Sequence, residues 1–328
     1  MSLVASFTFR EPTLKILLAC FVLLTSLHAA ELTPILRGTA ETELGVHREG
    51  NVYAPEVLRV GDQWLMWYGG QGRDGHDRIH LATSTDLKAW DKQGVVLDEA
   101  GVNHVNDPSV VRVGDVWWMF YTRAEHGISD EIAAATSTDG VHWELRGVVL
   151  APGEGDAWDS LIVGRPSVLY EEGRFRMWYD GCGLKPGQVR PTSDKPEALL
   201  AVATGRAVGY AESTDGLHWK RHGTAPIYGE GAGALHVSRV DGGYVMLYES
   251  HAGTRWASSR DGLTWTTRGV LAATSGGEAD RGGHVTPFLL ADQGPGPRQL
   301  FVGSNSGDWS KNWIGGIEVE RIEVLGEK

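Results

Sequence analysis

Acidic residues beside prolines are the first candidates for chemistry in this sequence. Asp107 lies in the phrase "HVNDPS" and Glu56 in "VYAPEV", each at the start of an apolar segment, and Asp159 lies in "PGEGDAWDS" before a third such segment. A carboxyl group can donate or accept a proton, and two of them flanking a bond can act as general acid and general base. We therefore predict Asp107, Glu56 and Asp159 as catalytic candidates.

A second set of residues has the types needed to bind a ligand rich in hydroxyl groups. Arginine and histidine donate hydrogen bonds, carboxylates accept them, and tryptophan offers a flat apolar face. Convergent polar groups beside aromatic rings suit a carbohydrate ligand. The predicted binding residues are Arg165, His236, His284, His104, Asp180, Glu249 and Trp309.

One short phrase recurs along the chain and bears on which acids are structural. It reads "STDLKAW" (84–90), "STDGVHW" (137–143), "STDGLHW" (213–219) and "SRDGLTW" (259–265). An Asp in such a turn accepts hydrogen bonds from nearby backbone N–H groups. The phrase resembles the Asp-box of sialidase-type propellers, which is structural. We therefore predict that its acids are turn residues, namely Asp86, Asp139, Asp215 and Asp261.

A longer phrase before each turn defines a repeat. Examples are "DPSVVRVGDVWWMFYTR" (107–123) and "RPSVLYEEGRFRMWYDG" (165–181), with a degenerate last copy at 286–305. Apart from Met1, every methionine falls at one position of the phrase: Met66, Met119, Met177 and Met246. Repeats of this length built from strands and turns indicate a β-propeller. We predict an all-β fold, a five-bladed β-propeller with four-stranded antiparallel blades, formed by residues 31–328 as a single domain.

The ends of the repeat array predict how the ring is closed. Residues 32–38 ("LTPILRG") resemble the last strand of a blade, so we expect residues 32–37 to complete the final blade. Such closure protects a sheet edge. The alternative is that the C-terminal strand fills this place and residues 31–50 pack as a loop.

The strand order also predicts which end of the propeller carries the chemistry. If each blade begins at one face, here called the near face, the tight turns belong to the opposite, far face. The long polar connections then gather at the near face, among them 69–78, 123–131 and 180–208. Long loops at one end of a rigid scaffold are the usual place for a site. The 180–208 insertion is expected to be irregular, with at most a short helix near 196–204.

Charge and the N-terminus limit the partners and the compartment. The formal net charge of −12 argues against nucleic acid or an anionic membrane as the main partner. Residues 1–30 contain Lys15, an apolar stretch at 16–24 and small residues to Ala30, which predicts a secretory signal. "LLAC" (17–20) leaves a lipoprotein anchor as the alternative. The mature protein is expected to be secreted or periplasmic, with Cys182 as its remaining cysteine and no intrachain disulfide.

The phrases "YAPEV" and "NDPSVVRVGDVWWMFY" resemble those of the five-bladed glycoside hydrolases of family 43 and its relatives, families 32, 117 and 130. In family 43, "WAPD" and "IDPS" open successive blades. The resemblance implies that Asp107 matches the Asp of "IDP", which tunes the acid and orients the substrate, and that Glu56 matches the acid of "WAPD".

The sequence departs from family 43 at a decisive place. Where that family has "EGP", whose Glu is the general acid, this chain has "GRP", so Gly164 stands where the Glu is expected and Arg165 follows it. The acid would then come from another near-face residue. The options are Asp159, Asp180, Glu125 or Glu249, or a histidine, His236 or His284, as proposed for family 117.

Two classes of function follow. The first is a secreted glycoside hydrolase that acts on a polysaccharide or oligosaccharide, and the family resemblance implies inversion. The second is a non-catalytic carbohydrate-binding propeller, or a polysaccharide lyase that uses a His or Tyr base with Arg165. No His or Cys spacing forms a recognised metal motif, so no cofactor is expected, and a structural Ca²⁺ on the axis is the one cation left open.

Overall fold

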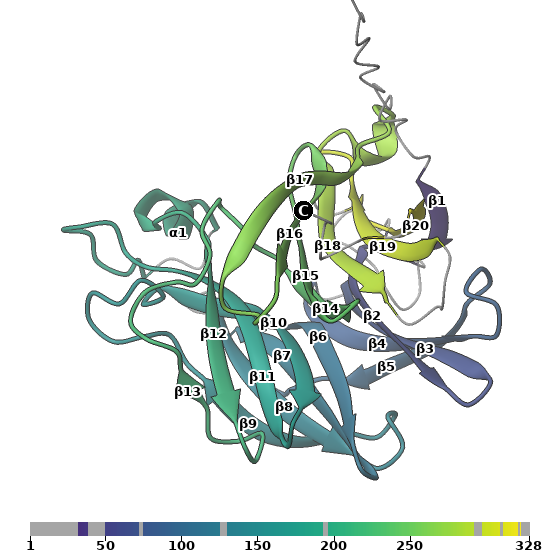
Figure 1. Cartoon of the computed structure of the whole chain (residues 1–328), viewed down its shortest axis with the longest axis horizontal. Helices are drawn as coiled ribbons and strands as arrows, with labels where there is room; N and C mark the ends of the chain where they lie inside the picture. The colour runs from purple at the N-terminus through teal and green to yellow at the C-terminus, as the bar shows by residue number, and fades with distance from the viewer. Residues whose placement is uncertain are drawn as a thin grey trace, which may run out of the picture.

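The computed structural model of the chain is built almost entirely from β-strands (Figure 1). It describes residues 32–38, 50–71, 75–124, 130–192, 196–291, 297–308, 311–320 and 322. The predicted signal segment, residues 1–30, lies outside this range. None of the helices in the described part of the chain has the length and apolar character needed to span a membrane.

The first two runs of strands are antiparallel and follow the chain order. The first run is β2 (Val52–Val60), β3 (Gln63–Gln71), β4 (Asp77–Ser84) and β5 (Asp91–Leu97). The second is β6 (His104–Val113), β7 (Val116–Ala124), β8 (Asp130–Ser137) and β9 (Glu144–Leu150). A single parallel pair, Asp77 with His104, joins the two runs into one eight-stranded sheet.

Three four-stranded sheets account for the rest of the described strands. The first contains β10 (Ile162–Glu171), β11 (Arg174–Cys182), β12 (Ala207–Ser213) and β13 (Lys220–Arg221). The second contains β14 (His236–Val240), β15 (Gly243–Tyr248), β16 (Gly253–Ser259) and β17 (Trp265–Ala273). The last contains β18 (Gly283–Leu290), β19 (Arg298–Asn305), β20 (Ile314–Val319) and β1 (Thr33–Leu36). The described part also holds the short helix α1 (Pro196–Val202), inside the insertion where a helix was predicted, and a 3-10 turn at Glu278–Asp280.

The first strands of the successive runs, here called the inner strands, contact one another in cyclic order. β2 contacts β6, β6 contacts β10, β10 contacts β14, β14 contacts β18, and β18 returns to β2. Strand β1 pairs antiparallel with β20, with Thr33 opposite Gly316, so the N-terminal segment adds a strand to the last sheet as predicted. In Figure 1 the purple β1 accordingly lies beside the yellow β20.

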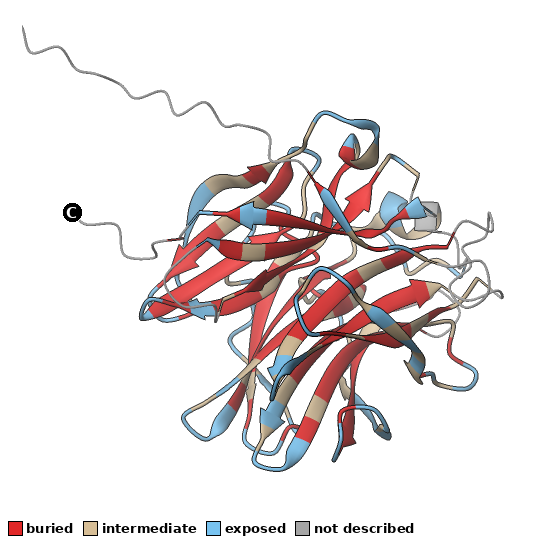
Figure 2. Ribbon diagram, turned by 90° about the vertical axis from the view of Figure 1, so that its right-hand side faces the viewer, coloured by how far each residue is buried: buried red, intermediate tan, exposed pale blue. Residues whose placement is uncertain are grey.

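The buried face of each sheet follows the repeat in the sequence. Met66, Met119, Met177 and Met246 are all fully buried, which explains why one repeat position carries them. Figure 2 shows the strands largely red, and the turns at their ends blue. The four repeated acids are turn residues, as predicted: in each, Oδ1 accepts two backbone N–H groups, for example those of Val141 and His142 on Asp139 at 2.8 Å each.

Side-chain oxygens on three inner strands, β2, β6 and β10, each tie one run of strands to the next. They occupy equivalent positions, and each accepts a backbone N–H from the neighbouring inner strand. The pairs are Glu56 Oε1 with Val110 N (3.3 Å), Ser109 Oγ with Val168 N (2.9 Å) and Ser167 Oγ with Val237 N (2.8 Å). A buried backbone N–H without a partner is costly, so these bonds help to hold the inner strands in register around the axis.

Candidate active site

A ring of strained residues marks the near-face end of the axis. One residue near the start of each inner strand has a left-handed φ between 44° and 51°, and four of the five precede a proline: Ala54, Asp107, Arg165, Ala234 and Thr286. Such a conformation is costly for a residue with a side chain and persists only where the surroundings enforce it. Here hydrogen bonds to the strained backbone do so, including Arg165 N to Thr122 Oγ1 (2.7 Å) and Ala54 N to Thr286 Oγ1 (2.9 Å).

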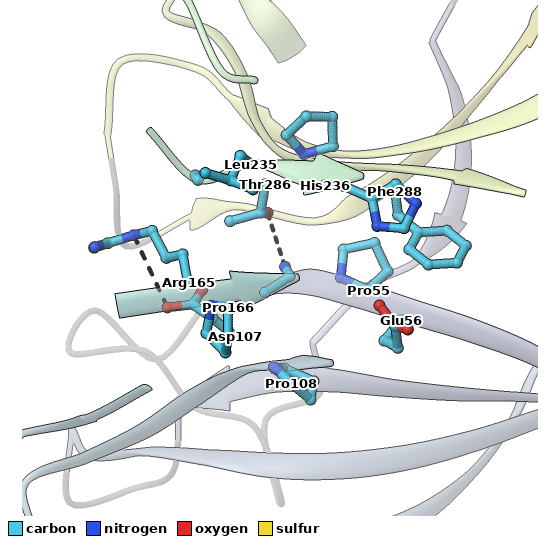
Figure 3. A pocket seen from close by; sticks show the side chains of 13 residues that line it. Pro55, Glu56, Asp107, Pro108, Arg165, Pro166, Leu235, His236, Thr286 and Phe288 are labelled. Carbon is cyan, nitrogen blue, oxygen red and sulfur yellow. Dashed lines mark hydrogen bonds and ion pairs between the residues drawn. The ribbon is translucent and has the colours of Figure 1, made fainter. Parts of the chain in front are cut away.

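The strained ring borders a small pocket on the axis, of about 30 Å³. A volume of this size holds about one or two water molecules, so a larger ligand must lie over the mouth of the pocket. Figure 3 shows Asp107 and Arg165 facing each other on one side of it, with Glu56, His236 and Phe288 on the other. The pocket therefore has a charged side, formed by Asp107 and Arg165, and an opposite side, formed by Glu56, His236 and Phe288, that faces the interior.

Asp107 is the central acid of the charged side. It is 7% exposed, and its Oδ2 lies 3.9 Å from Arg165 Nε. Burial raises the pKa of Asp107 to about 6, although Arg165 and a hydrogen bond from Thr122 oppose that shift. Within the described residues Oδ2 has no hydrogen-bond partner, so the buried carboxyl group keeps an unused acceptor atom. With a pKa of about 6 it is half-protonated near pH 6 and about one-tenth protonated at pH 7.

Arg165 gathers three carboxylates. Besides Asp107, its Nη1 lies 3.4 Å from Asp180 Oδ1 and 3.6 Å from Asp130 Oδ2. Burial lowers the pKa of Arg165, but the three aspartates outweigh it and hold that pKa well above its ordinary value. The guanidinium therefore stays charged and fixes the position of the acids around it.

Asp180 is fully buried and has both oxygens engaged. Oδ2 accepts Arg206 Nη1 at 2.6 Å and the Ala234 N–H at 2.7 Å, while Oδ1 faces Arg165. Because both oxygens already have donors, this carboxylate suits positioning of the two arginines better than proton transfer.

Glu249, at the end of β15, joins the same cluster. Burial raises its pKa, while Arg206 and Arg165 act in the opposite direction. Glu249 is thus close enough to both arginines to feel their charge, and its role as a binding residue stays a prediction. The cluster thus combines acids from the near-face ends of β6, β8, β11 and β15 with arginines that balance part of their charge.

A second dyad borders the cluster. His104 Nδ1 lies 2.6 Å from Asp77 Oδ2, and Asn106 Nδ2 donates to Tyr53 Oη at 2.9 Å. Burial lowers the pKa of His104, but the hydrogen bond and charge of Asp77 outweigh this and raise it. His104 is about one third exposed, so its other ring nitrogen can meet a ligand.

Glu56 and His236 form the interior floor of the pocket. Burial raises the pKa of Glu56 to about 8, against the opposing Val110 N–H, and burial lowers the pKa of His236 to about 3. His236 bonds Ser238 Oγ at 2.7 Å and packs against the Phe288 ring. Both side chains are therefore uncharged near neutral pH. Glu56 also accepts the Val110 N–H and so joins strands β2 and β6.

Two of the predicted site residues, Asp159 and His284, are not brought to this cluster. The Asp159 carboxylate accepts Tyr179 Oη and Arg221 Nε, both at 2.9 Å, and Arg221 lies on the outer strand β13. His284 is buried between Thr254 Oγ1 and Asp280, where burial lowers its pKa. Trp309 lies outside the described residues. The prediction of Asp159 as a catalytic acid and of His284 as a ligand contact thus lacks support from their surroundings, because both side chains already have partners within the fold.

The structure adds site residues that sequence reasoning missed: Thr122, Asp130, Arg206 and Asp77. Each lies at or near the end of a strand, where the strand meets a near-face connection. A search that included the near-face ends of all strands, and not only of the inner strands, could have found them. Asp130 also explains the departure at Gly164. A side-chain carbon at position 164 would lie 3.2 Å from Thr122 and 3.7 Å from Asp130 Cβ, so these residues border the space that a larger residue would enter.

The described residues contain no cluster of side chains suited to bind a metal ion. In the part of the chain that the structure describes, no group of three or more His, Cys, Asp or Glu side chains has an arrangement that could hold an ion. Arg165 and Arg206 balance part of the charge of the near-face acids.

Comparison with solved structures establishes the fold. A protein described as a glycoside hydrolase superposes with a TM-score of 0.71 over 92% of this chain and 95% of its own, at 19% identity. A family 117 glycoside hydrolase from the marine bacterium Zobellia galactanivorans gives 0.65 over 92% and 94%, at 13% identity. The chain thus has the fold of the propeller glycoside hydrolases, as its repeat phrases predicted.

Sequence comparisons cover less of the chain. No protein-family model matches it. An uncharacterised protein of Mycobacterium tuberculosis is 33% identical over 142 residues, 39% of this chain and 46% of that protein. A β-1,2-mannobiose phosphorylase of Thermoanaerobacter sp. is 26% identical over 124 residues, 36% of this chain and 39% of that enzyme. The matches thus span less than half the length of these curated relatives.

Proposed function

We propose that this chain cleaves glycosidic bonds at the near-face end of a five-bladed propeller that β1 closes. The cyclic contacts of the inner strands and the pairing of β1 with β20 support that architecture. The single observation that carries the function is the Asp107 carboxyl group. It is buried at the axis, has a pKa of about 6, and faces Arg165 amid further acids.

Asp107 takes the role of general acid. A carboxyl group with a pKa near the working pH is protonated often enough to donate, and its conjugate base is stable enough to leave the proton behind. Arg165 stabilises that conjugate base at 3.9 Å. Thr122 orients the carboxyl group, because its hydroxyl bonds Asp107 while accepting the Arg165 N–H.

Asp130 takes the role of general base, in the space left by Gly164. Its side chain is 27% exposed, unlike the fully buried Asp180, so it can reach a water molecule. Asp107 and Asp130 contact different nitrogens of one guanidinium, which is compatible with the separation of about 6.5–9.5 Å that inverting enzymes use. Glu249 is the second candidate for this role.

The charge balance of the site favours an uncharged sugar. Asp77, Asp107, Asp130, Asp180 and Glu249 face two guanidinium groups and one imidazole. An additional carboxylate on the substrate would meet more negative than positive charge, which disfavours the lyase alternative. The same charge balance opposes a phosphate anion, so the second candidate, phosphorolysis, rests on the activity named for the Thermoanaerobacter relative and not on the charges of the site.

The test is sugar release from a panel of β- and α-linked oligosaccharides and aryl glycosides, with and without inorganic phosphate. Wild type is compared with Asp107→Asn and Asp130→Asn, and with Asp159→Asn as the matched carboxylate outside the cluster. We expect a loss of at least about a hundredfold in kcat for the first two variants. Products that appear only with phosphate, as sugar phosphates, would identify phosphorolysis.

A carbohydrate-binding propeller is the remaining alternative. It predicts saturable sugar binding by wild type without release of product on any substrate, with or without phosphate. Equal activity in Asp107→Asn and wild type would instead contradict the assignment of Asp107. Export of the mature chain and removal of residues 1–30 remain part of the proposal and rest on the N-terminal sequence.

A further inference from the structure

The far-face end of the axis holds a cavity much larger than the near-face pocket. Its volume is about 550 Å³, and its lining comes from the far-face halves of all the inner strands: β2, β6, β10, β14 and β18. Protein sites for small organic ligands have volumes of about 300–1,000 Å³, so this space is of the right size for one. None of the residues assigned to sugar cleavage except the floor residues Glu56 and His236 borders it.

The wall of the cavity is apolar and its floor is polar but uncharged. Valine and leucine side chains supply the wall, among them Leu58, Val60, Val111, Leu169 and Leu289. Phe288 and His236, which pack against each other, separate the cavity from the near-face pocket together with Glu56. An occupant would therefore bury a hydrocarbon group along the wall, where removal of apolar surface from water drives binding.

Arginines stand at equivalent positions around the mouth. Arg59, Arg112 and Arg239 each lie near the far-face end of an inner strand and border the cavity. Arg112 pairs with the fully exposed Asp115 at 3.6 Å, and Arg239 pairs with Glu171 at 3.2 Å. Arg59 is exposed and lies over the Trp64 ring, and in the described part of the chain no carboxylate is within ion-pair distance of it.

We propose that the far-face cavity binds a small amphipathic anion, with its hydrocarbon part along the valine–leucine wall and its acidic group at Arg59. The apolar lining suits the hydrocarbon part of such a ligand. Arg59, which has no carboxylate partner among the described residues, suits its acidic group. This binding is separate from the proposed sugar cleavage and does not depend on it.

The test uses decanoate as the probe, with decanol and decyltrimethylammonium as neutral and cationic probes of matched chain length. Isothermal titration of the full chain is expected to show one decanoate per protein with a Kd of about 10–100 μM, the range for a ligand of this size. Decanol should bind at least about fivefold more weakly than decanoate, and decyltrimethylammonium should bind more weakly than decanol.

Substitutions then locate the site. Arg59→Gln should weaken decanoate binding about fivefold, whereas Arg268→Gln, on the outer strand β17, should leave the Kd unchanged. Leu58→Trp and Leu169→Trp fill the cavity from two different sheets and should each abolish binding in a protein that keeps its native melting transition.

Several outcomes would overturn the proposal. Absence of saturable binding would do so, as would equal affinity for decanoate and decyltrimethylammonium. Loss of binding in Asp107→Asn with retention in both tryptophan variants would place the probe at the near face instead. None of these results bears on whether the protein cleaves sugars, because sugar release is measured separately.

Discussion

Replacement of Glu56 by glutamine should make the protein more stable, and by an amount that depends on pH. Burial raises the pKa of Glu56 from 4.5 to about 8. Below pH 4.5 the carboxyl group is protonated in both the folded and the unfolded chain, so it adds no pH dependence there. Between the two pKa values the unfolded chain loses its proton while the folded protein keeps it, so stability falls as the pH rises and levels off above the folded pKa.

The magnitude follows from the size of the shift. One pKa unit corresponds to about 1.4 kcal/mol, so the rise from 4.5 to about 8 costs wild type about 5 kcal/mol of unfolding free energy between pH 4.5 and pH 8.5. Glutamine keeps the oxygen that accepts the Val110 N–H but has no proton to lose. Glu56→Gln should therefore match wild type near pH 4.5 and exceed it by several kcal/mol at pH 8.5.

Urea unfolding of both proteins at pH 4.5, 6, 7 and 8.5 measures this difference. Other titrating groups contribute equally to the two proteins, so the difference between them isolates Glu56. Parallel stability curves across the pH range would refute the reasoning, because they would mean that Glu56 ionises normally in the folded protein.

Three further predictions concern the site and the ring. Replacement of Arg165 by glutamine removes the charge that lowers the pKa of Asp107, so the alkaline limb of kcat/KM, expected near pH 6, should move to higher pH in a pH–rate profile. Ser109→Ala should destabilise the protein by about 1–3 kcal/mol in urea, because it leaves a buried backbone N–H without an acceptor, while Ser109→Thr should largely restore the bond. Gly209→Ala places a carbon 2.2 Å from the Tyr179 ring and should cost about 1–3 kcal/mol, whereas Gly205→Ala, with open space around it, should change the melting transition little.

Local patterns in the sequence were sufficient to predict the strands and turns. Turn chemistry is local, so the repeated Ser-Asp phrase was enough to identify Asp139 and its equivalents as turn acids, and their hydrogen bonds follow that prediction. The methionine positions fixed the alignment of the repeats, and all four methionines are buried. The helix expected inside the 180–208 insertion is α1.

The repeat alignment placed the site most directly where a site residue lies next to a proline on an inner strand. Asp107 and Arg165 stand at equivalent repeat positions on neighbouring inner strands, so the alignment placed them together, and they face each other on one side of the axis. Asp159 shows the limit of such reasoning. Its loop was correctly assigned to the near face, but its carboxylate turns to Arg221 on an outer strand 62 residues later in the chain.

The sequence alone therefore determined the repeat, the strand order and the end of the molecule that gathers polar loops, because these depend on neighbouring residues and on strand direction. Only the tertiary structure decided which acids share Arg165. Strand ends from separate sheets converge at the axis, and no sequence spacing encodes the distance from Asp130 or Asp180 to a guanidinium on another strand. Burial likewise decided that Glu56 keeps its proton near neutral pH and that His236 is neutral, since desolvation depends on what surrounds a group in space rather than along the chain.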